Sequence, residues 1–286
     1  MTTGRRIAAF SMLISGMLAL IKLFAGIVGH STAVVADGLE SAGDVFASGL
    51  VWLGLTLAAK PADAEHPYGH GRVETLAGLL IGLVLTVGGA LISYGSLVRL
   101  GQPKTTPANF VIWPLLVSLA AKSGLATFKF RYGARLRSAA LVADAWNDTM
   151  DTLSAAAALI GVGLALSDPA RFLDADRYGG FAVGLIIVLT GLRVSRDTAL
   201  QLMDTMPDER LMTQIRAEAT AIPGVRGVEK CFARKTGLRY HVDLHLEVDP
   251  EMTVRHSHEI ARDVRARIVQ RLDWVADVLV HVEPAP

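Results

Sequence analysis

Residues 31–58, STAVVADGLESAGDVFASGLVWLGLTLA, decide the fold, because this stretch is apolar enough to cross a membrane and yet contains Asp37, Glu40 and Asp44. About 20 apolar helical residues cross the roughly 30 Å of bilayer hydrocarbon. Glu40 and Asp44 stand four residues apart and Asp37 lies one turn earlier, so the three share one helix face. A charge at the bilayer centre costs at least about 2.5–3.5 kcal/mol. The stretch therefore predicts a membrane helix whose acids face partners inside the protein.

The composition extends this pattern to most of the chain. The 286 residues are 51% hydrophobic, the mean hydropathy is +0.40, and charged residues become clearly denser after residue 204. The sequence predicts an all-α, six-helix transmembrane bundle over residues 1–204 and a soluble domain over residues 205–286. The six expected spans are 6–28, 32–58, 74–99, 109–130, 138–165 and 178–200.

The distribution of Lys and Arg at the ends of these spans sets the expected orientation. Most of them fall on the side that carries both chain termini, which the positive-inside rule assigns to the cytoplasm. The first apolar run has no small-residue cleavage site and is expected to remain as the first helix. The single Cys231 excludes an intramolecular disulfide and suits a reducing cytoplasm. The net charge of +1 gives no sign of nucleic-acid binding, and no nucleic acid is expected as a partner.

The fifth span repeats the acidic pattern of the second. In it, Asn147 and Asp151 stand four residues apart and Asp144 lies one turn earlier. If the two helices face each other, four oxygen ligands converge, with Asp37 and Asp144 directly behind them. We therefore expect a divalent-cation site at Glu40, Asp44, Asn147 and Asp151.

A different interpretation is that these acids pair with buried lysines, or take up protons and hydrogen-bond between helices. Lys22 and Lys122 are the basic residues that fall clearly within the spans. Two lysines are too few for this number of acids, and nothing in the sequence places them opposite the acidic faces. The sequence thus favours a cation site over internal ion pairs.

A second group of possible ligands occupies the loop before the third span. Asp63, His66 and His70 are spaced three and four residues apart, and Pro67 and Gly69 indicate a turn. Imidazole and carboxylate together suit a transition metal better than Mg²⁺ or Ca²⁺. A solvated loop with histidines present by chance explains the spacing equally well.

The soluble domain has its own periodicity. A helix is expected from Pro207, two strands meet near Gly237, a helix covers about 253–271, and DVLVHVEP supplies a last strand. Apolar and polar residues alternate strictly along residues 240–249. The order αββαβ predicts a small α+β domain with two helices on one face of a sheet. Cys231 is expected to point into its core.

Four motifs in the expected positions make this sequence resemble the cation diffusion facilitator family of divalent-metal exporters. They are ADGLESAGD in the second span, HPYGHGRVETL entering the third, ADAWNDTMD in the fifth and LMDTMPDE leaving the sixth. The resemblance covers essentially the whole chain. It implies a homodimer, joined through a metallochaperone-like cytoplasmic domain, that exchanges cytoplasmic metal for protons in the plasma membrane of a bacterium.

The resemblance also implies roles for individual residues. The transport site falls on Glu40, Asp44, Asn147 and Asp151, and the variable loop site falls on Asp63, His66 and His70. Arg72 and Asp204 match a pair that ties the membrane and soluble domains together. The regulatory metal ligands of the soluble domain would be His245, His258, His281 and Glu283. A solvated polar sheet face is the other explanation for those histidines.

The expected transport site differs from that of zinc-selective relatives, which usually have His or Asp at the position of Glu40 and His at that of Asn147. A site with only carboxylate and amide oxygens favours Mn²⁺ or Fe²⁺ over tetrahedral Zn²⁺. Desolvation disfavours the charged form of a carboxylic acid, so an empty site tends to hold protons that a metal displaces. The expected function is proton-coupled efflux in which the metal is substrate and possible regulator, with no other cofactor.

Alternatives remain at this point. One is an exporter of the same family for Zn²⁺, Co²⁺ or Cd²⁺. Another is a membrane metal sensor that does not transport, which would keep the ligands of the soluble domain but does not need facing carboxylates in the bilayer. A Mg²⁺-dependent enzyme acting on phosphorylated lipid is disfavoured, because no basic residue stands within a turn of either acidic pair to hold phosphate. The protein is therefore not expected to be an enzyme.

Overall fold

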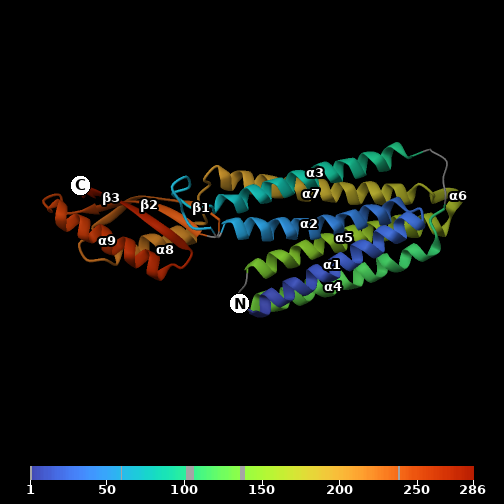
Figure 1. Ribbon diagram of the computed structural model, residues 1–286, viewed down its shortest axis with the longest axis horizontal. Helices are drawn as coiled ribbons and strands as arrows, with labels where there is room; N and C mark the ends of the chain where they lie inside the picture. The colour runs from blue at the N-terminus through green and yellow to red at the C-terminus, as the bar shows by residue number, and fades with distance from the viewer. Residues whose placement is uncertain (1, 59, 101–105, 136–138, 238) are drawn as a thin grey trace. The chain divides into compact units, whose positions relative to one another are not determined.

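The computed structural model describes residues 2–58, 60–100, 106–135, 139–237 and 239–286 (Figure 1). They form long helices followed by a mixed domain, which confirms the predicted fold class. The membrane-type helices are α1 (Thr2–Val28), α2 (Thr32–Ala58), α3 (Arg72–Val98), α4 (Ile112–Arg135), α5 (Ala139–Ser167) and α7 (Ala175–Leu202), with short η1 (Asn109–Val111) and α6 (Pro169–Phe172) between them.

Several of these helices carry wide apolar surfaces of the kind that contact lipid. Within the described part of the chain, α3, residues 109–132, residues 145–167 and α7 are each long and apolar enough to cross a membrane. On α1, Leu13, Leu20 and Phe24 are exposed at helical spacing. Large exposed side chains along one helix face are costly in water but favourable in hydrocarbon.

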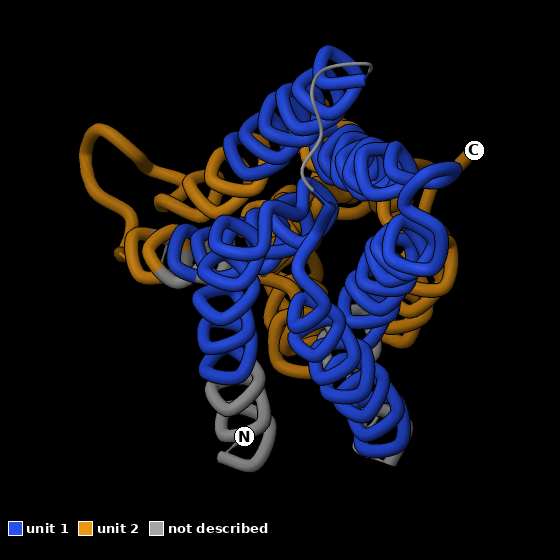
Figure 2. The backbone as a smooth tube through the Cα atoms, turned by 90° about the vertical axis from the view of Figure 1, so that its right-hand side faces the viewer, with its two compact units in different colours: residues 1–50, 80–195 blue, residues 51–79, 196–286 orange. Residues whose placement is uncertain are grey.

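The chain divides into two compact units, residues 1–50 with 80–195 and residues 51–79 with 196–286 (Figure 2). The predicted division at residue 204 stays a prediction. In the first unit, a core of small and branched side chains joins α2, α5 and α7, and includes Ala33, Val34, Ala158, Val162 and Val183.

Within this first unit, α3 and α7 approach closely along a row of glycines. A methyl group added at Gly89 would lie 2.7 Å from the carbonyl oxygen of Gly184, and one added at Gly191 would lie 2.6 Å from the backbone nitrogen of Thr86. Small residues at regular spacing allow helix backbones to pack tightly where burial of apolar surface offers no driving force between helices.

The second unit contains the α+β domain, in the predicted order αββαβ. Its elements are α8 (Glu209–Thr220), β1 (Gly227–Thr236), β2 (Arg239–Val248), α9 (Val254–Arg271) and β3 (Val275–Pro284). The strand order is β1-β2-β3, with β1 antiparallel and β3 parallel to β2. The parallel pair requires a crossover connection, which α9 provides.

The predicted alternation along β2 places one side of the sheet in the core. Val242, Leu244 and Leu246 are buried against Ile215 of α8 and Val264 of α9. Cys231 of β1 is buried with them, as predicted. Burial raises the pKa of its thiol to about 11, so it stays protonated at neutral pH.

Candidate functional site

The acids of α2 and α5 face each other inside the first unit. Glu40 and Asp151 are buried, and Asp44 is partly buried. Ser154 of α5 donates a 2.8 Å hydrogen bond to Glu40 Oε1 of α2, and the carboxyl groups of Asp44 and Asp151 both lie within 4 Å of Lys122 Nζ. The predicted juxtaposition of the second and fifth spans is therefore present in the structure.

Buried lysines lie among these acids, in an arrangement that the sequence did not indicate. Lys22 of α1 pairs with Asp37 at 2.8 Å. Lys122 of α4 donates to Asp151 Oδ2 at 2.5 Å, and its Nζ lies 3.8 Å from Asp44 Oδ2. Lys22 and Lys122 reach the acidic faces because α1 and α4 pack beside α2 and α5 (Figure 1).

Two further charged residues complete the group. Asp148 is buried and lies 3.4 Å from Lys122 Nζ and 2.6 Å from Lys129 Nζ. Lys129 lies near the end of the expected span 109–130, and its side chain is fully buried. The carboxylate–lysine cluster is hereafter Asp37, Glu40, Asp44, Asp148, Asp151, Lys22, Lys122 and Lys129.

The cluster contains three of the four predicted transport ligands, Glu40, Asp44 and Asp151. The fourth, Asn147, has an exposed side chain, and as a ligand it stays a prediction. The side chain of Asp144 lies outside the described residues.

The sequence analysis did not single out Asp148, although its position three residues before Asp151 places both on neighbouring parts of one helix face. Glu40 Oε2 is buried without a hydrogen-bond partner among the described atoms, which makes it available to a proton or a metal ion.

The loop ligands of the second unit converge as their spacing suggested. Asp63 Oδ2 lies 3.4 Å from His70 Nε2, and Asp63 Oδ1 lies 3.3 Å from His66 Nδ1. One atom from each of the three residues lies within 4.8 Å of the others. The backbone N–H of His66 donates to Asp63 and holds the pKa of that carboxyl below its usual value, so Asp63 is ionised at neutral pH. The loop thus brings together three side chains of metal-ligating types, of which Asp63 and His66 are exposed and His70 is partly buried.

A second convergence of ligands lies on the polar side of the sheet. His245 of β2 and His281 of β3 are register partners, and Glu283 Oε1 lies 2.6 Å from His245 Nδ1 and 3.5 Å from His281 Nε2. Hydrogen bonds with Glu229 and His245 lower the pKa of Glu283, so it is an anionic acceptor near neutral pH. His258 is exposed on α9 and does not belong to the described three-residue group.

This group supports a prediction for the soluble domain. A metal that binds the folded state alone stabilises it by about 2.7 kcal/mol at 100 times its Kd. His245→Ala should abolish any such stabilisation of the sheet by Zn²⁺ or Mn²⁺, measured as thermal unfolding of the full chain with and without metal. His256→Ala, which removes an exposed histidine of α9, serves as the control. Equal stabilisation of both variants would remove His245 from the ligands.

The pair expected to link the domains is also formed. Arg72 Nη2 at the start of α3 donates to Asp204 Oδ1 at 2.7 Å. Asp204 follows α7 and has a φ of 55°, in the left-handed region that aspartate tolerates better than most residues. Both side chains are nearly half exposed, so the pair contributes at most about 1 kcal/mol to stability. Its role in tying the membrane and soluble domains together stays a prediction.

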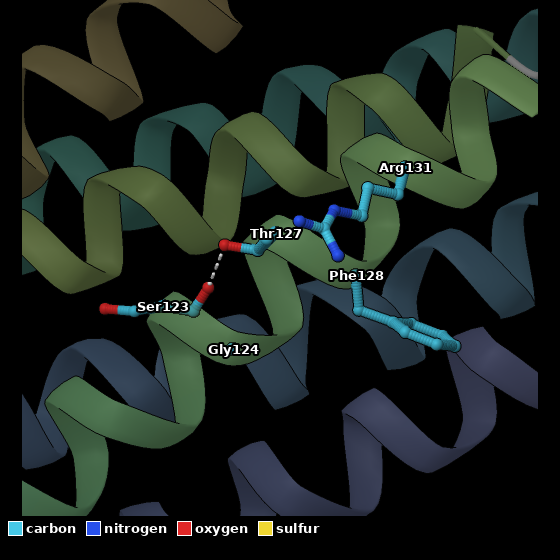
Figure 3. A pocket seen from close by; sticks show the side chains of 5 residues that line it. All are labelled: Ser123, Gly124, Thr127, Phe128 and Arg131. Atoms are coloured by element: carbon cyan, nitrogen blue, oxygen red, sulfur yellow. Dashed lines mark hydrogen bonds between the residues drawn. The ribbon is translucent and has the colours of Figure 1, made fainter.

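A hollow on α4 is separate from these groups. Its described lining consists of Ser123, Gly124, Thr127, Phe128 and Arg131, all on that helix (Figure 3). Thr127 donates a 2.9 Å hydrogen bond to the carbonyl oxygen of Ser123. The predicted ligands come from α2, α5, the loop before α3 and the sheet, so this hollow is not the predicted site.

Comparison with protein families supports the same interpretation over nearly the whole chain. Residues 8–203 match the model described as the cation efflux transmembrane domain. Residues 207–285 match the model described as the cation efflux protein, cytoplasmic domain.

Curated proteins of several organisms are similar over most of their length. The manganese efflux system protein MneP of Bacillus subtilis is 30% identical over 98% of this chain and 96% of its own. The magnetosome protein MamB of Magnetospirillum gryphiswaldense is 30% identical over 94% and 90%. Metal tolerance protein C1 of Arabidopsis thaliana is 31% identical over 94% of this chain and 60% of its own.

Proposed function

This chain belongs to the cation diffusion facilitator family of multi-pass cation efflux transporters, and from that premise we propose that it exports Mn²⁺ or Fe²⁺ from the cytoplasm in exchange for protons. The observation that carries the proposal is the convergence of Glu40, Asp44 and Asp151, a set of oxygen ligands with no imidazole or thiolate beside it among the described contacts. Hard oxygen ligands suit these ions. The name of MneP, a manganese efflux system protein, agrees with this choice.

The exchange of metal for protons follows from the chemistry of these carboxyl groups. A carboxylic acid removed from water favours its neutral form. Metal binding requires the carboxylate, so protons leave when the ion enters and return when it departs. If the site opens alternately to the two sides of the membrane, metal and protons compete for the same oxygens and move in opposite directions.

The remaining parts of the proposal concern assembly and orientation. We place the transport domain in residues 1–204 and the dimerising domain in residues 205–286, with both termini in the cytoplasm of a bacterium. The match of residues 207–285 to a cytoplasmic domain model supports this orientation. The loop site of Asp63, His66 and His70 would then meet cytoplasmic metal, and the group of His245, His281 and Glu283 would sense it.

Selectivity is tested by adding one imidazole. In proteoliposomes with an imposed pH gradient, the wild-type protein should transport Mn²⁺ or Fe²⁺ faster than Zn²⁺. Asn147→His should shift this preference toward Zn²⁺ by roughly tenfold, because imidazole is a softer ligand than an amide oxygen. Asn109→His, in η1, is the matched control and should leave the preference unchanged.

The outcomes separate the possibilities. If the wild-type protein transports Zn²⁺ best, export stands and the argument from oxygen ligands fails. If Asn147→His leaves the preference unchanged, Asn147 is not a ligand. Absence of flux for every metal would contradict transport and favour a membrane metal sensor.

A further inference from the structure

Lys122 is a buried cation placed at the predicted metal ligands themselves. Its side chain is 1% exposed, although it comes from α4 and the predicted ligands come from α2 and α5. An ammonium group removed from water is expensive unless it is paired and hydrogen-bonded. The protein supplies those partners here, so the position of Lys122 requires an explanation beyond packing.

The ammonium group has partners of two kinds. On one side it contacts predicted metal ligands, with Nζ 2.5 Å from Asp151 Oδ2 and 3.8 Å from Asp44 Oδ2. On the other side it donates to residues that are not predicted ligands, Ser15 Oγ at 2.9 Å and Asp148 Oδ1 at 3.4 Å. All three ammonium protons therefore have acceptors, as the charged form of lysine requires.

A metal ion and this ammonium group compete for the same oxygen. Metal–oxygen bonds to carboxylates are about 2.0–2.2 Å long, so an ion on Asp151 Oδ2 would lie next to the position that Nζ takes. Two positive charges at that separation repel strongly, and the ammonium group has to leave Asp151. Lysine has a long flexible stem, and Ser15 and Asp148 remain as acceptors after it leaves.

The charge of the cluster fits such a competition. Its five carboxyl groups and three lysines carry a net charge of −2 when all are ionised, which one divalent cation neutralises. The other two lysines sit on acids outside the predicted ligand set, Lys22 on Asp37 and Lys129 on Asp148. Lys122, by contrast, lies within 4 Å of both Asp44 and Asp151.

We propose that Lys122 is a tethered counter-cation of the transport site, which holds Asp44 and Asp151 when no metal is bound and withdraws to Asp148 and Ser15 when metal enters. This proposal rests on the proposed function. Every binding event then includes the displacement of one positive charge, and its return helps to expel the ion. Lys122 thereby limits affinity so that the exporter can release its substrate.

The test compares neutral and charged replacements of Lys122. Lys122→Gln and Lys122→Met remove the competing charge, and Mn²⁺ should bind the purified full chain roughly tenfold or more tightly. Lys122→Arg keeps the charge, and its Kd should stay within a few-fold of wild type. In proteoliposomes, both neutral variants should show a lower KM and a lower maximal flux, because release becomes slower. Lys60→Met, which removes an exposed lysine outside the cluster, is the control and should leave the Kd and the flux unchanged.

A structural role for Lys122 predicts a different pattern. In that case the neutral variants bind Mn²⁺ equally or more weakly, which would overturn the proposal. If the neutral variants unfold without metal, they can be purified with Mn²⁺ bound. The bound ion should then be lost to a chelator roughly tenfold more slowly than from the wild-type protein. Loss at the wild-type rate also overturns the proposal. If the wild-type protein binds no divalent cation, the proposed function is contradicted. If the wild-type protein transports metal and the neutral variants do not bind it more tightly, only the proposed role of Lys122 is contradicted.

Discussion

Asp151→Asn should reduce metal flux in proteoliposomes by at least about 100-fold, the largest functional effect expected in this chain. Asp151 of α5 accepts a 2.5 Å hydrogen bond from Lys122 of α4, whose Nζ also lies 3.8 Å from Asp44 Oδ2 of α2, so the three helices meet beside Asp151. The amide keeps the shape and can accept a hydrogen bond, but it loses the charge that binds the metal and the group that exchanges it for protons.

The membrane domain should nevertheless remain folded in this variant. Lys122 keeps Asp148 and Ser15 as partners, so its charge is not left buried alone. Folding is checked by the yield and elution of the purified protein in detergent. Asp197→Asn, which changes an exposed aspartate of α7, is the control and should transport normally. Normal metal uptake by Asp151→Asn would refute the assignment of Asp151 to the transport site.

Leu244→Ala should produce the largest loss of stability, and it should be confined to the α+β domain. Leu244 is fully buried at the centre of β2, between strands β1 and β3 and beneath the two helices. Truncating a buried leucine removes its transfer free energy and leaves a cavity, at a cost of about 2–5 kcal/mol. A domain of this size has few other residues to compensate for that loss.

Hydrogen exchange of the full chain measures this effect locally. Backbone amides of β1 and β2 should exchange roughly 30-fold faster or more in Leu244→Ala, while amides of α5 keep their wild-type rates. Val254→Ala, which truncates an 85% exposed side chain at the start of α9, should change protection little. Unchanged exchange in β2 would show that Leu244 does not carry the core as its burial indicates.

The sequence predicted the elements of this protein well, because the signals that define them are local. Six long apolar segments correspond to α1, α2, α3, α4, α5 and α7, with ends displaced by a few residues. The alternation of residues 240–249 placed Val242, Leu244 and Leu246 in the core. The three- and four-residue spacing of Asp63, His66 and His70 also corresponds to the group that the loop forms. Such patterns reflect the periods of helices, strands and turns, which a chain carries without reference to its tertiary neighbours.

The partners of the buried acids were decided by the tertiary structure. Spacing within α2 and α5 indicated two acidic faces, but it could not show that Lys22 and Lys122 would be delivered to those faces from α1 and α4. It also could not show that Lys129 is buried against Asp148 and that Asn147 is exposed. The reason is physical: helical spacing determines which residues share a face, whereas helix packing determines what that face meets. The ligands could therefore be proposed from the sequence alone, but the charge that balances them came only from the packing of four helices.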